Sequence, residues 1–187
     1  DINQEINPIN FYGETKAEAE RSIKEILFKN NQALIIRTSW VVSEFGNNFV
    51  LKVLNLLQEK KILNVVCDQI GTPTSTHSLA SACWKVITEH SSKDSNLLKR
   101  NPILHWSDSG VASWYDVAIT VQEIAKELKI LKKSTIINPV LSKDFKTIAK
   151  RPHFSVLNCL NSYEMLNLTP IYWRKSLKSI LYNYNNP

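Results

Sequence analysis

The chain has 187 residues, of which 43% are hydrophobic, and its 23 lysines and arginines outnumber 17 aspartates and glutamates to give a net charge of +6. This hydrophobic content suffices for a packed core and excludes an intrinsically disordered chain. No apolar run approaches the ~18 residues of a membrane span, so no membrane partner is expected. The four glycines are far apart, which excludes a glycine-rich loop around a nucleotide phosphate.

The first half of the sequence predicts helices that alternate with short strands. Asn7 and Pro8 are typical of a helix start, as cap and first helical residue, and this helix is expected to continue to about Phe28. A continuous apolar run at residues 33–36 is typical of a strand buried on both faces of a parallel sheet. The next expected elements are a helix over 47–60, a strand over 62–66 and a turn-rich segment over 68–74.

The second half is expected to be more helical. Ser113 precedes the clearest periodic run, in which apolar residues recur every three to four positions and predict a helix to about Leu128. Strands are expected at 103–105 and 136–140, and an irregular polar segment at 142–158. The remaining expectations are a helix over 78–90, a loop over 91–101 and two short helices near 160–167 and 172–184.

This order of elements predicts an α/β fold with a mainly parallel sheet in the first half. From about residue 68 onward, the pattern suits a smaller lobe that faces the substrate. Two helices have an expected apolar side, formed by Ala19, Ile23, Ile26 and Leu27 in the first and by Leu79, Ala82, Cys83, Val86 and Ile87 in the helix over 78–90.

Cysteines, histidines and charges exclude several kinds of site. Cys67, Cys83 and Cys159 are far apart and form no CxxC motif, which argues against disulfides and structural zinc and fits a reducing, cytoplasmic setting. The four histidines lack metal-binding spacing, so no metal site is expected. Basic residues gather late in the chain without an arginine-rich run or an aromatic platform. We therefore expect no nucleic-acid partner, and either a solvated surface or a patch for an anionic small molecule.

Tyr12 and Lys16 carry the first chemical signal. They are four residues apart in the first predicted helix, which places both on one face about one turn apart. A lysine ammonium beside a phenol favours the phenolate. Such a tyrosine can protonate a carbonyl oxygen as hydride reaches the carbon, or run the reverse reaction. The same spacing also arises between two unrelated surface residues, so the pair does not decide by itself.

Further segments, in chain order, resemble the motifs of one family. They are YGETK (12–16), IIRTSWV (35–41), FGNNFV (45–50), VVCDQIGTPT (65–74), SWYDVA (113–118), KRP with SVLN (150–152, 155–158) and PIYWR (170–174). Together they resemble dTDP-4-dehydrorhamnose reductases of the extended short-chain dehydrogenase/reductase superfamily, and the first resembles the YxxxK motif of that superfamily. The resemblance covers essentially the whole chain, and such an ordered set is far more specific than one YxxxK.

The resemblance implies a partial Rossmann-like, doubly wound parallel sheet with a smaller, mainly helical substrate-binding lobe. Residues 1–67 would form the C-terminal part of the NAD(P)-binding domain and 68–187 the substrate-binding lobe, and the chain can pass between the two more than once. By the same resemblance, Tyr12 is the catalytic acid/base, while Lys16 holds the nicotinamide ribose and tunes Tyr12. The glycine-rich loop of the family, and the Ser or Thr that completes its triad, would lie upstream, so this chain alone is expected to bind NADPH poorly and to be inactive.

The resemblance also implies five substrate-binding residues. Trp40 would line the sugar-nucleotide site from the carboxyl end of a strand, where open α/β sheets bind ligands, or would pack in the core. Asn48 would open a helix whose N-terminus favours a diphosphate, or would serve only as a cap. Gln69 and Thr74 would face the substrate from a turn that could equally be structural. Arg151 would bind diphosphate oxygens bidentately, with a rim salt bridge as the alternative.

These roles imply reduction of the 4-keto group of dTDP-4-dehydro-L-rhamnose to dTDP-L-rhamnose, with NADPH or NADH as the hydride donor. One alternative is a non-catalytic protein that resembles the regulatory subunit of methionine adenosyltransferase, against which the retained Tyr12 and Lys16 argue. Another is a nucleotide-sugar epimerase or dehydratase of the same superfamily, which the RTSW and DQxGxPT motifs disfavour. The expected partner is a nucleotide sugar. The sequence leaves open a homodimer and a Mg²⁺ ion between subunits.

Overall fold

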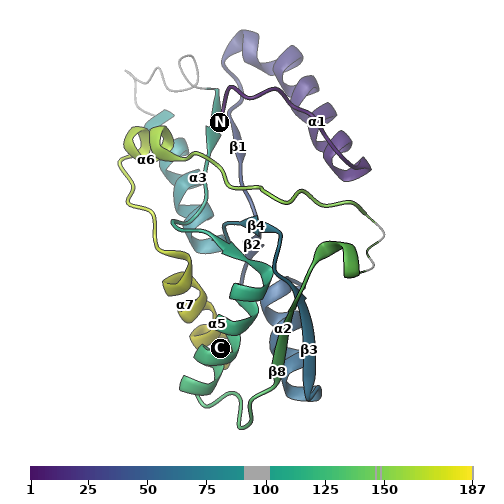
Figure 1. The fold of residues 1–187 in the computed structure, drawn as a ribbon. Coiled ribbons are helices and arrows are strands. Elements are labelled where there is room, and N and C mark those ends of the chain that lie inside the picture. Colours follow the sequence, from purple (N-terminus) through teal and green to yellow (C-terminus); the bar gives the residue numbers. More distant parts are fainter. Residues whose placement is uncertain (91–101, 146, 148, 187) are drawn as a thin grey trace.

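The computed structural model describes residues 1–90, 102–145, 147 and 149–186, and its helices alternate with short strands (Figure 1). The helices are α1 (Phe11–Leu27), η1 (Phe28–Asn30), α2 (Phe49–Glu59), α3 (Thr76–His90), α5 (Trp114–Glu127), η2 (Ser142–Asp144), α6 (Leu160–Leu166) and α7 (Trp173–Asn185). The strands are β1 (Ile35–Arg37), β2 (Val41–Val42), β3 (Ile62–Val66), β4 (Ile70–Gly71), β5 (Thr74–Ser75), β6 (Ile103–His105), β7 (Ala112–Ser113) and β8 (Ile136–Val140). The expected loop over 91–101 lies outside the described residues. Within them, no helix has the length and apolar character needed to cross a membrane.

The strands form two-stranded sheets in the described part of the chain. Three pairs are parallel, namely β1 with β6, β2 with β5 and β3 with β8, whereas β4 and β7 pair antiparallel. The longest pairing aligns Ile62 with Ile136 and Val66 with Val140. Parallel neighbours require crossover connections, and the helices between these strands supply them. The expected α/β fold with parallel strands is therefore confirmed.

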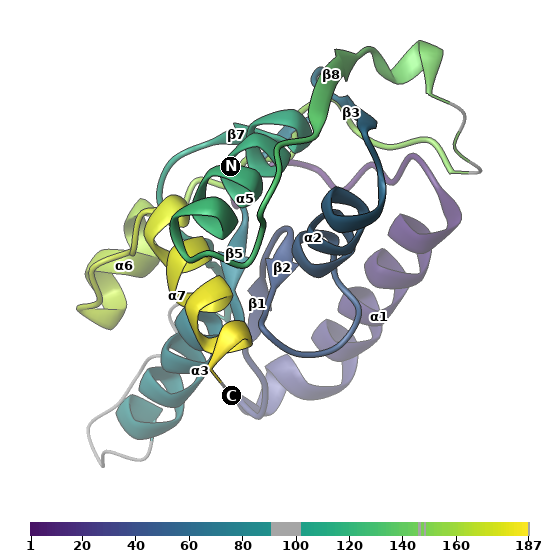
Figure 2. The same ribbon diagram turned by 90° about the horizontal axis from the view of Figure 1, so that it is seen from below.

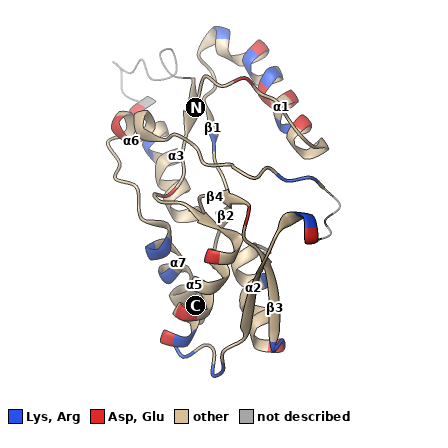
Figure 3. Cartoon of the chain, viewed as in Figure 1, with Lys and Arg blue, Asp and Glu red and all other residues tan. Residues whose placement is uncertain are grey.

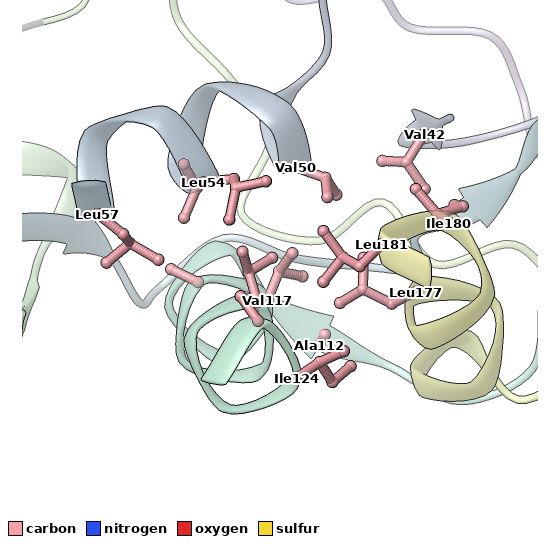
Figure 4. Packing of buried hydrophobic residues seen from close by; sticks show 14 of the residues in the cluster. Val42, Val50, Leu54, Leu57, Ala112, Val117, Ile124, Leu177, Ile180 and Leu181 are labelled. Carbon is pink, nitrogen blue, oxygen red and sulfur yellow. The ribbon is translucent and has the colours of Figure 1, made fainter. Parts of the chain in front are cut away.

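The main hydrophobic core lies between α2, α5 and α7, which run side by side (Figure 2). Leu54 of α2, Val117 of α5 and Leu181 of α7 all belong to this core and are fully buried (Figure 4). Each such side chain contributes roughly 1.5–3 kcal/mol relative to an exposed position. A second, smaller cluster joins α3, β6 and α6 around Ala82, Leu104 and Leu166.

Side-chain caps define the starts of the two helices that border the cavity described below. The Asn48 side chain accepts hydrogen bonds from Val50 N and Leu51 N at the start of α2. Ser113 and Asp116 form a reciprocal capping box at the start of α5, in which each side chain bonds to the backbone of the other. These caps satisfy amide groups that would otherwise lack partners in the first turn.

Two expected apolar faces are wrong in part. In α1 the only buried residue is Glu20, and Ile26 is 69% exposed. In α3, Ala82 and Val86 are buried, but Cys83 and Ile87 are exposed. The reason is geometric in α3, because positions four apart form one narrow stripe against β6 and α6, and the adjacent stripe faces outward.

Candidate functional site

Tyr12 and Lys16 lie on one face of α1, in its first two turns. Asn10 caps this helix, since its Oδ1 accepts a hydrogen bond from Gly13 N at 2.8 Å. Lys16 Nζ lies 5.4 Å from the centroid of the Tyr12 ring, and Tyr12 is 70% exposed. Neither the Tyr12 hydroxyl nor the Lys16 ammonium has a hydrogen-bond or ion-pair partner among the described residues. Both polar groups are therefore free to contact a ligand.

Polar contacts attach α1 to the rest of the chain. In the described residues, α1 contributes nothing to either hydrophobic cluster. Glu20 accepts hydrogen bonds from Arg37 Nε at 2.9 Å and Nη2 at 2.5 Å, and these bonds lower the pKa of Glu20 to about 2. At the other end, Asn10 Nδ2 donates to the Lys150 carbonyl oxygen at 2.8 Å. This contact places the first turn of α1 beside a basic stretch of the segment between η2 and α6 (Figures 1 and 3).

A cavity of about 230 Å³ opens beside that segment. Its walls come from α2, β3, the start of α5 and the chain after β8. Phe49, Val65 and Trp114 give it apolar and aromatic surfaces, whereas Gln69 and Arg151 are polar groups at its border. The structure thus brings together two of the predicted substrate residues, Gln69 and Arg151. The Arg151 side chain is exposed, and no described residue forms an ion pair or hydrogen bond with its guanidinium group.

A chain of hydrogen bonds fixes the Gln69 side chain. Gln69 Nε2 donates to Ser142 Oγ at 2.9 Å, and Ser142 Oγ donates to Asp68 Oδ1 at 2.6 Å. The hydrogen bonds from Ser142 hold the pKa of the Asp68 carboxyl below its usual range. Asp68 is therefore ionised near neutral pH and can keep accepting the Ser142 hydroxyl. Gln69 is mostly buried, so its carboxamide has a defined orientation at the border of the cavity.

A second hollow of about 470 Å³ adjoins the first and shares Gln69 and Arg151 with it. Lys143, Lys150 and Asp68 line it as well, so with Arg151 three cationic side chains and one carboxylate border this side of the site. Positive charge around a hollow favours an anionic ligand group such as a phosphate. The two hollows thus provide an apolar compartment and a cationic compartment that meet at Arg151.

Trp40 lies behind the cavity wall. Its indole stacks on that of Trp114 with ring centroids 3.5 Å apart, and it packs against the main core. Trp40 is not among the residues that line either hollow, whereas Trp114 lines the first. The structure therefore separates these two tryptophans into a supporting residue and a lining residue.

Asn48 and Thr74 also lie away from the cavity surface. Asn48 uses both ends of its carboxamide, because Nδ2 donates to the Ser43 and Phe45 carbonyl oxygens while Oδ1 caps α2. Thr74 is fully buried, and its amide donates to the Trp40 carbonyl oxygen at 3.0 Å. The bonds of Asn48 hold the segment that leads into the lining residue Phe49, and the bond of Thr74 holds the backbone of the supporting residue Trp40.

Sequence reasoning missed several lining residues. Phe49 and Trp114 line the cavity, but neither was among the predicted substrate residues. Ser142, which orients Gln69, lies in a segment expected to be irregular. The pattern offered a signal for the aromatic residues only, since each opens a helix directly after its cap. Across the described residues, no cluster of His, Cys, Asp or Glu could hold a metal ion.

A family model described as the RmlD substrate binding domain matches residues 1–186. The chain belongs to this family. A curated dTDP-4-dehydrorhamnose reductase from Aggregatibacter actinomycetemcomitans is 35% identical over 179 residues, which are 94% of this chain and 58% of that protein. The resemblance inferred from the ordered motifs is confirmed.

Solved structures show the same relationship for the fold of this RmlD-family chain. A dTDP-4-dehydrorhamnose reductase from Clostridium acetobutylicum matches with a TM-score of 0.83 and 33% identity, over 98% of this chain and 59% of that one. A dTDP-4-dehydrorhamnose reductase from Bacillus anthracis, solved in complex with NADP, matches with a TM-score of 0.82 and 28% identity over the same shares. The chain therefore spans a little under three fifths of the length of these relatives.

Proposed function

We propose that the protein supplies the Tyr–Lys helix and the nucleotide-sugar site of an NADPH-dependent reductase that converts dTDP-4-dehydro-L-rhamnose to dTDP-L-rhamnose. The observation that carries this proposal is the contact between the cap of α1 and the Lys150 carbonyl, next to the Arg151 that borders the cavity. Membership of the RmlD substrate binding domain family supports it. Relatives named as dTDP-4-dehydrorhamnose reductases, one of them in complex with NADP, support the substrate and the cofactor.

In the proposed reaction, Tyr12 gives its hydroxyl proton to the O4 atom of the sugar as C4 is reduced. The Lys16 ammonium stabilises the phenolate that remains and would hold the ribose of the cofactor. NADPH, when bound, supplies the hydride. The exposed, unpartnered hydroxyl of Tyr12 and ammonium of Lys16 fit this use, because nothing in the described chain competes for either group.

In the proposed complex, each of the two hollows holds a different part of the nucleotide. The flat thymine ring occupies the aromatic cavity against Phe49 and Trp114. Arg151 binds the diphosphate bidentately, and Lys150 adds positive charge from the adjoining hollow. Gln69 bonds to the nucleotide at the border between the two.

The other predicted substrate residues act on the same site in this proposal. Asn48 fixes the start of α2, which carries Phe49. Trp40 supports the face of Trp114, and Thr74 holds the Trp40 backbone. These three residues would therefore shape the nucleotide site through the aromatic residues that line it.

We also propose the division into a cofactor-side part, residues 1–67, and a substrate lobe, 68–187. The pairing of β6 with β1 supports a chain that returns to the first part after entering the second. A cytoplasmic location is supported by the three cysteines, all of which are free thiols.

Two measurements test the proposed function. The first is titration of the chain with dTDP, followed by tryptophan fluorescence, with saturable quenching expected because Trp114 lines the cavity. The second is NADPH oxidation driven by dTDP-4-dehydro-L-rhamnose, using the chain joined to the unmatched part of the Bacillus anthracis relative. Binding of dTDP without any NADPH oxidation would favour a non-catalytic binding protein, and absence of dTDP binding would refute the proposed site.

A further inference from the structure

One carboxamide connects the helix of Tyr12 to the segment of Arg151. Asn10 Oδ1 accepts the hydrogen bond of Gly13 N at 2.8 Å, and Asn10 Nδ2 donates to the Lys150 carbonyl oxygen at 2.8 Å. The first bond caps the N-terminus of α1, and Tyr12 lies in that helix two residues after Asn10. The second reaches across 140 positions of the sequence. A side chain that only capped the helix would need the oxygen alone.

The segment around Arg151 is held on both sides of that residue. On one side stands the bond from Asn10 to Lys150. On the other, Ile70 N donates to the His153 carbonyl oxygen at 2.8 Å, and His153 Nδ1 lies 3.0 Å from the carbonyl oxygen of Asp68. Arg151 itself has no partner among the described residues, so these flanking bonds fix the backbone from which its side chain extends and leave the guanidinium group available to a ligand.

The helix α1 is also sensitive to a contact at its start. No apolar residue of α1 joins the described hydrophobic clusters, and its other anchor, the pair of Glu20 with Arg37, lies more than two turns further along. A change in the position of the Lys150 carbonyl therefore acts directly on the first turn of α1, where Tyr12 lies. Likewise, a displacement of the first turn of α1 acts on the position of the Lys150 carbonyl.

We propose that Asn10 is a positioning residue that couples occupation of the diphosphate site at Arg151 to the placement of Tyr12. This inference rests on the proposed nucleotide-sugar site. A diphosphate bound by Arg151 restrains the segment further, Asn10 transmits that order to the cap of α1, and Tyr12 is held more firmly when substrate is bound. Reciprocally, loss of the Asn10 bond to Lys150 weakens nucleotide binding although Asn10 lies outside the cavity.

The two bonds of Asn10 can be separated by substitution. In Asn10→Ser the hydroxyl still caps α1, because Ser and Asn are comparable N-caps, but it is too short to reach Lys150. Asn10→Asp keeps the cap oxygen and removes the donor, with an added negative charge, so agreement between the two variants excludes a purely electrostatic effect. The matched control is Asn158→Ser, since Asn158 is an exposed asparagine whose Oδ1 accepts from Leu160 N at the start of α6.

Amide hydrogen exchange with and without saturating dTDP provides the test. The reporters are the amides of Gly13 and Glu14, which bond to the Asn10 side chain and carbonyl oxygen. In the unmodified chain and in Asn158→Ser, dTDP is expected to slow their exchange. In Asn10→Ser and Asn10→Asp this slowing should disappear, while the dissociation constant for dTDP rises about 2- to 12-fold, the range for one lost hydrogen bond.

The outcomes separate this inference from the proposed function. If dTDP binds but leaves exchange at Gly13 and Glu14 unchanged, or slows it equally in Asn10→Ser, the coupling is wrong and the nucleotide site stands. If the unmodified chain does not bind dTDP at all, both are wrong. Circular dichroism and thermal unfolding of each variant establish that α1 and the fold are intact, so a loss of binding is not mistaken for unfolding.

Discussion

Trp40 and Trp114 stack face to face, with ring centroids 3.5 Å apart and planes 9° from parallel. Gly71 packs against the indole of Trp40, since a Cβ atom on Gly71 would stand 2.4 Å from Cε2 of that ring. Trp114 in turn lines the apolar cavity. A glycine on β4 thus leaves room for the supporting tryptophan, which backs the wall of the candidate nucleotide site.

Substitution of Gly71 by alanine is expected to destabilise the chain and distort this wall. The added methyl group overlaps the ring of Trp40, and overpacking of this kind costs roughly 1–3 kcal/mol. Urea unfolding gives the free-energy change, and dTDP titration gives the effect on the cavity. Gly46→Ala is the comparison, because nothing lies within 4 Å of that position, although its φ of +71° carries a backbone cost of about 1–2 kcal/mol. Only Gly71→Ala should also weaken dTDP binding, and equal binding by both variants would contradict the supporting role of Trp40.

The ion pair of Glu20 with Arg37 predicts a defined pH dependence of stability. Hydrogen bonds from Arg37 lower the pKa of Glu20 from 4.5 to about 2. The folded-state pKa is depressed, so this stabilisation is fully present above about pH 4.5 and is lost as the pH falls toward 2. Glu20→Gln should lower the free energy of unfolding near pH 7 by about 1–3 kcal/mol and should lose less stability than the unmodified chain between pH 4.5 and 2.

Urea unfolding across that pH range measures the difference. Glu18→Gln is the control, because Glu18 pairs with Arg21 on the exposed side of α1, where ion pairs contribute about 0–1 kcal/mol. Identical pH profiles for Glu20→Gln and the unmodified chain would show that the pair with Arg37 does not stabilise the fold.

Most of the regular elements could be predicted because their signals are local. The apolar runs predicted β3 at 62–66, β6 at 103–105 and β8 at 136–140, with the bounds that the structure has. The cap residue Ser113 predicted the start of α5. The two-residue strands β2, β4, β5 and β7 were not predicted, since a pairing such as Ile70 with Ser113 depends on contacts between distant segments and leaves no periodicity in two residues.

The site was less accessible from sequence than the fold. The spacing of Tyr12 and Lys16 follows from helix geometry, and the two side chains do share a face of α1. The meeting of Gln69 with Arg151 was expected from the family resemblance, not from spacing. The bond from Asn10 to Lys150 could not be predicted, because the sequence indicated Asn7 and not Asn10 as the cap of this helix, and no local pattern joins residues 140 positions apart.

Arg151→Ala is expected to weaken dTDP binding strongly while leaving stability unchanged. The guanidinium group has no partner in the described chain, so its loss costs the fold nothing, whereas a charge-assisted bond to a diphosphate contributes about 1.5–3 kcal/mol, or roughly 10- to 150-fold in affinity. Fluorescence titration with dTDP at two salt concentrations measures the effect. Arg21→Ala removes the same charge from the exposed side of α1 and should leave affinity nearly unchanged. Equal losses in both variants would mean that the charge acts through the overall field and that Arg151 makes no direct contact.

Tyr12→Phe is expected to abolish reduction without loss of nucleotide binding. The substitution removes only the hydroxyl, which is exposed and unpartnered, so neither the packing of α1 nor its cap changes. A general acid of this kind contributes about 10²- to 10⁴-fold to the rate, and kcat for NADPH oxidation in the joined protein should fall by that factor while its KM for the keto sugar stays close to the original value. Tyr184→Phe, which removes an exposed hydroxyl from α7, is the matched control and should retain full activity. Full activity in Tyr12→Phe would mean that another group donates the proton. Lys16, whose ammonium group lies 5.4 Å from the centroid of the Tyr12 ring, would then be the next residue to substitute.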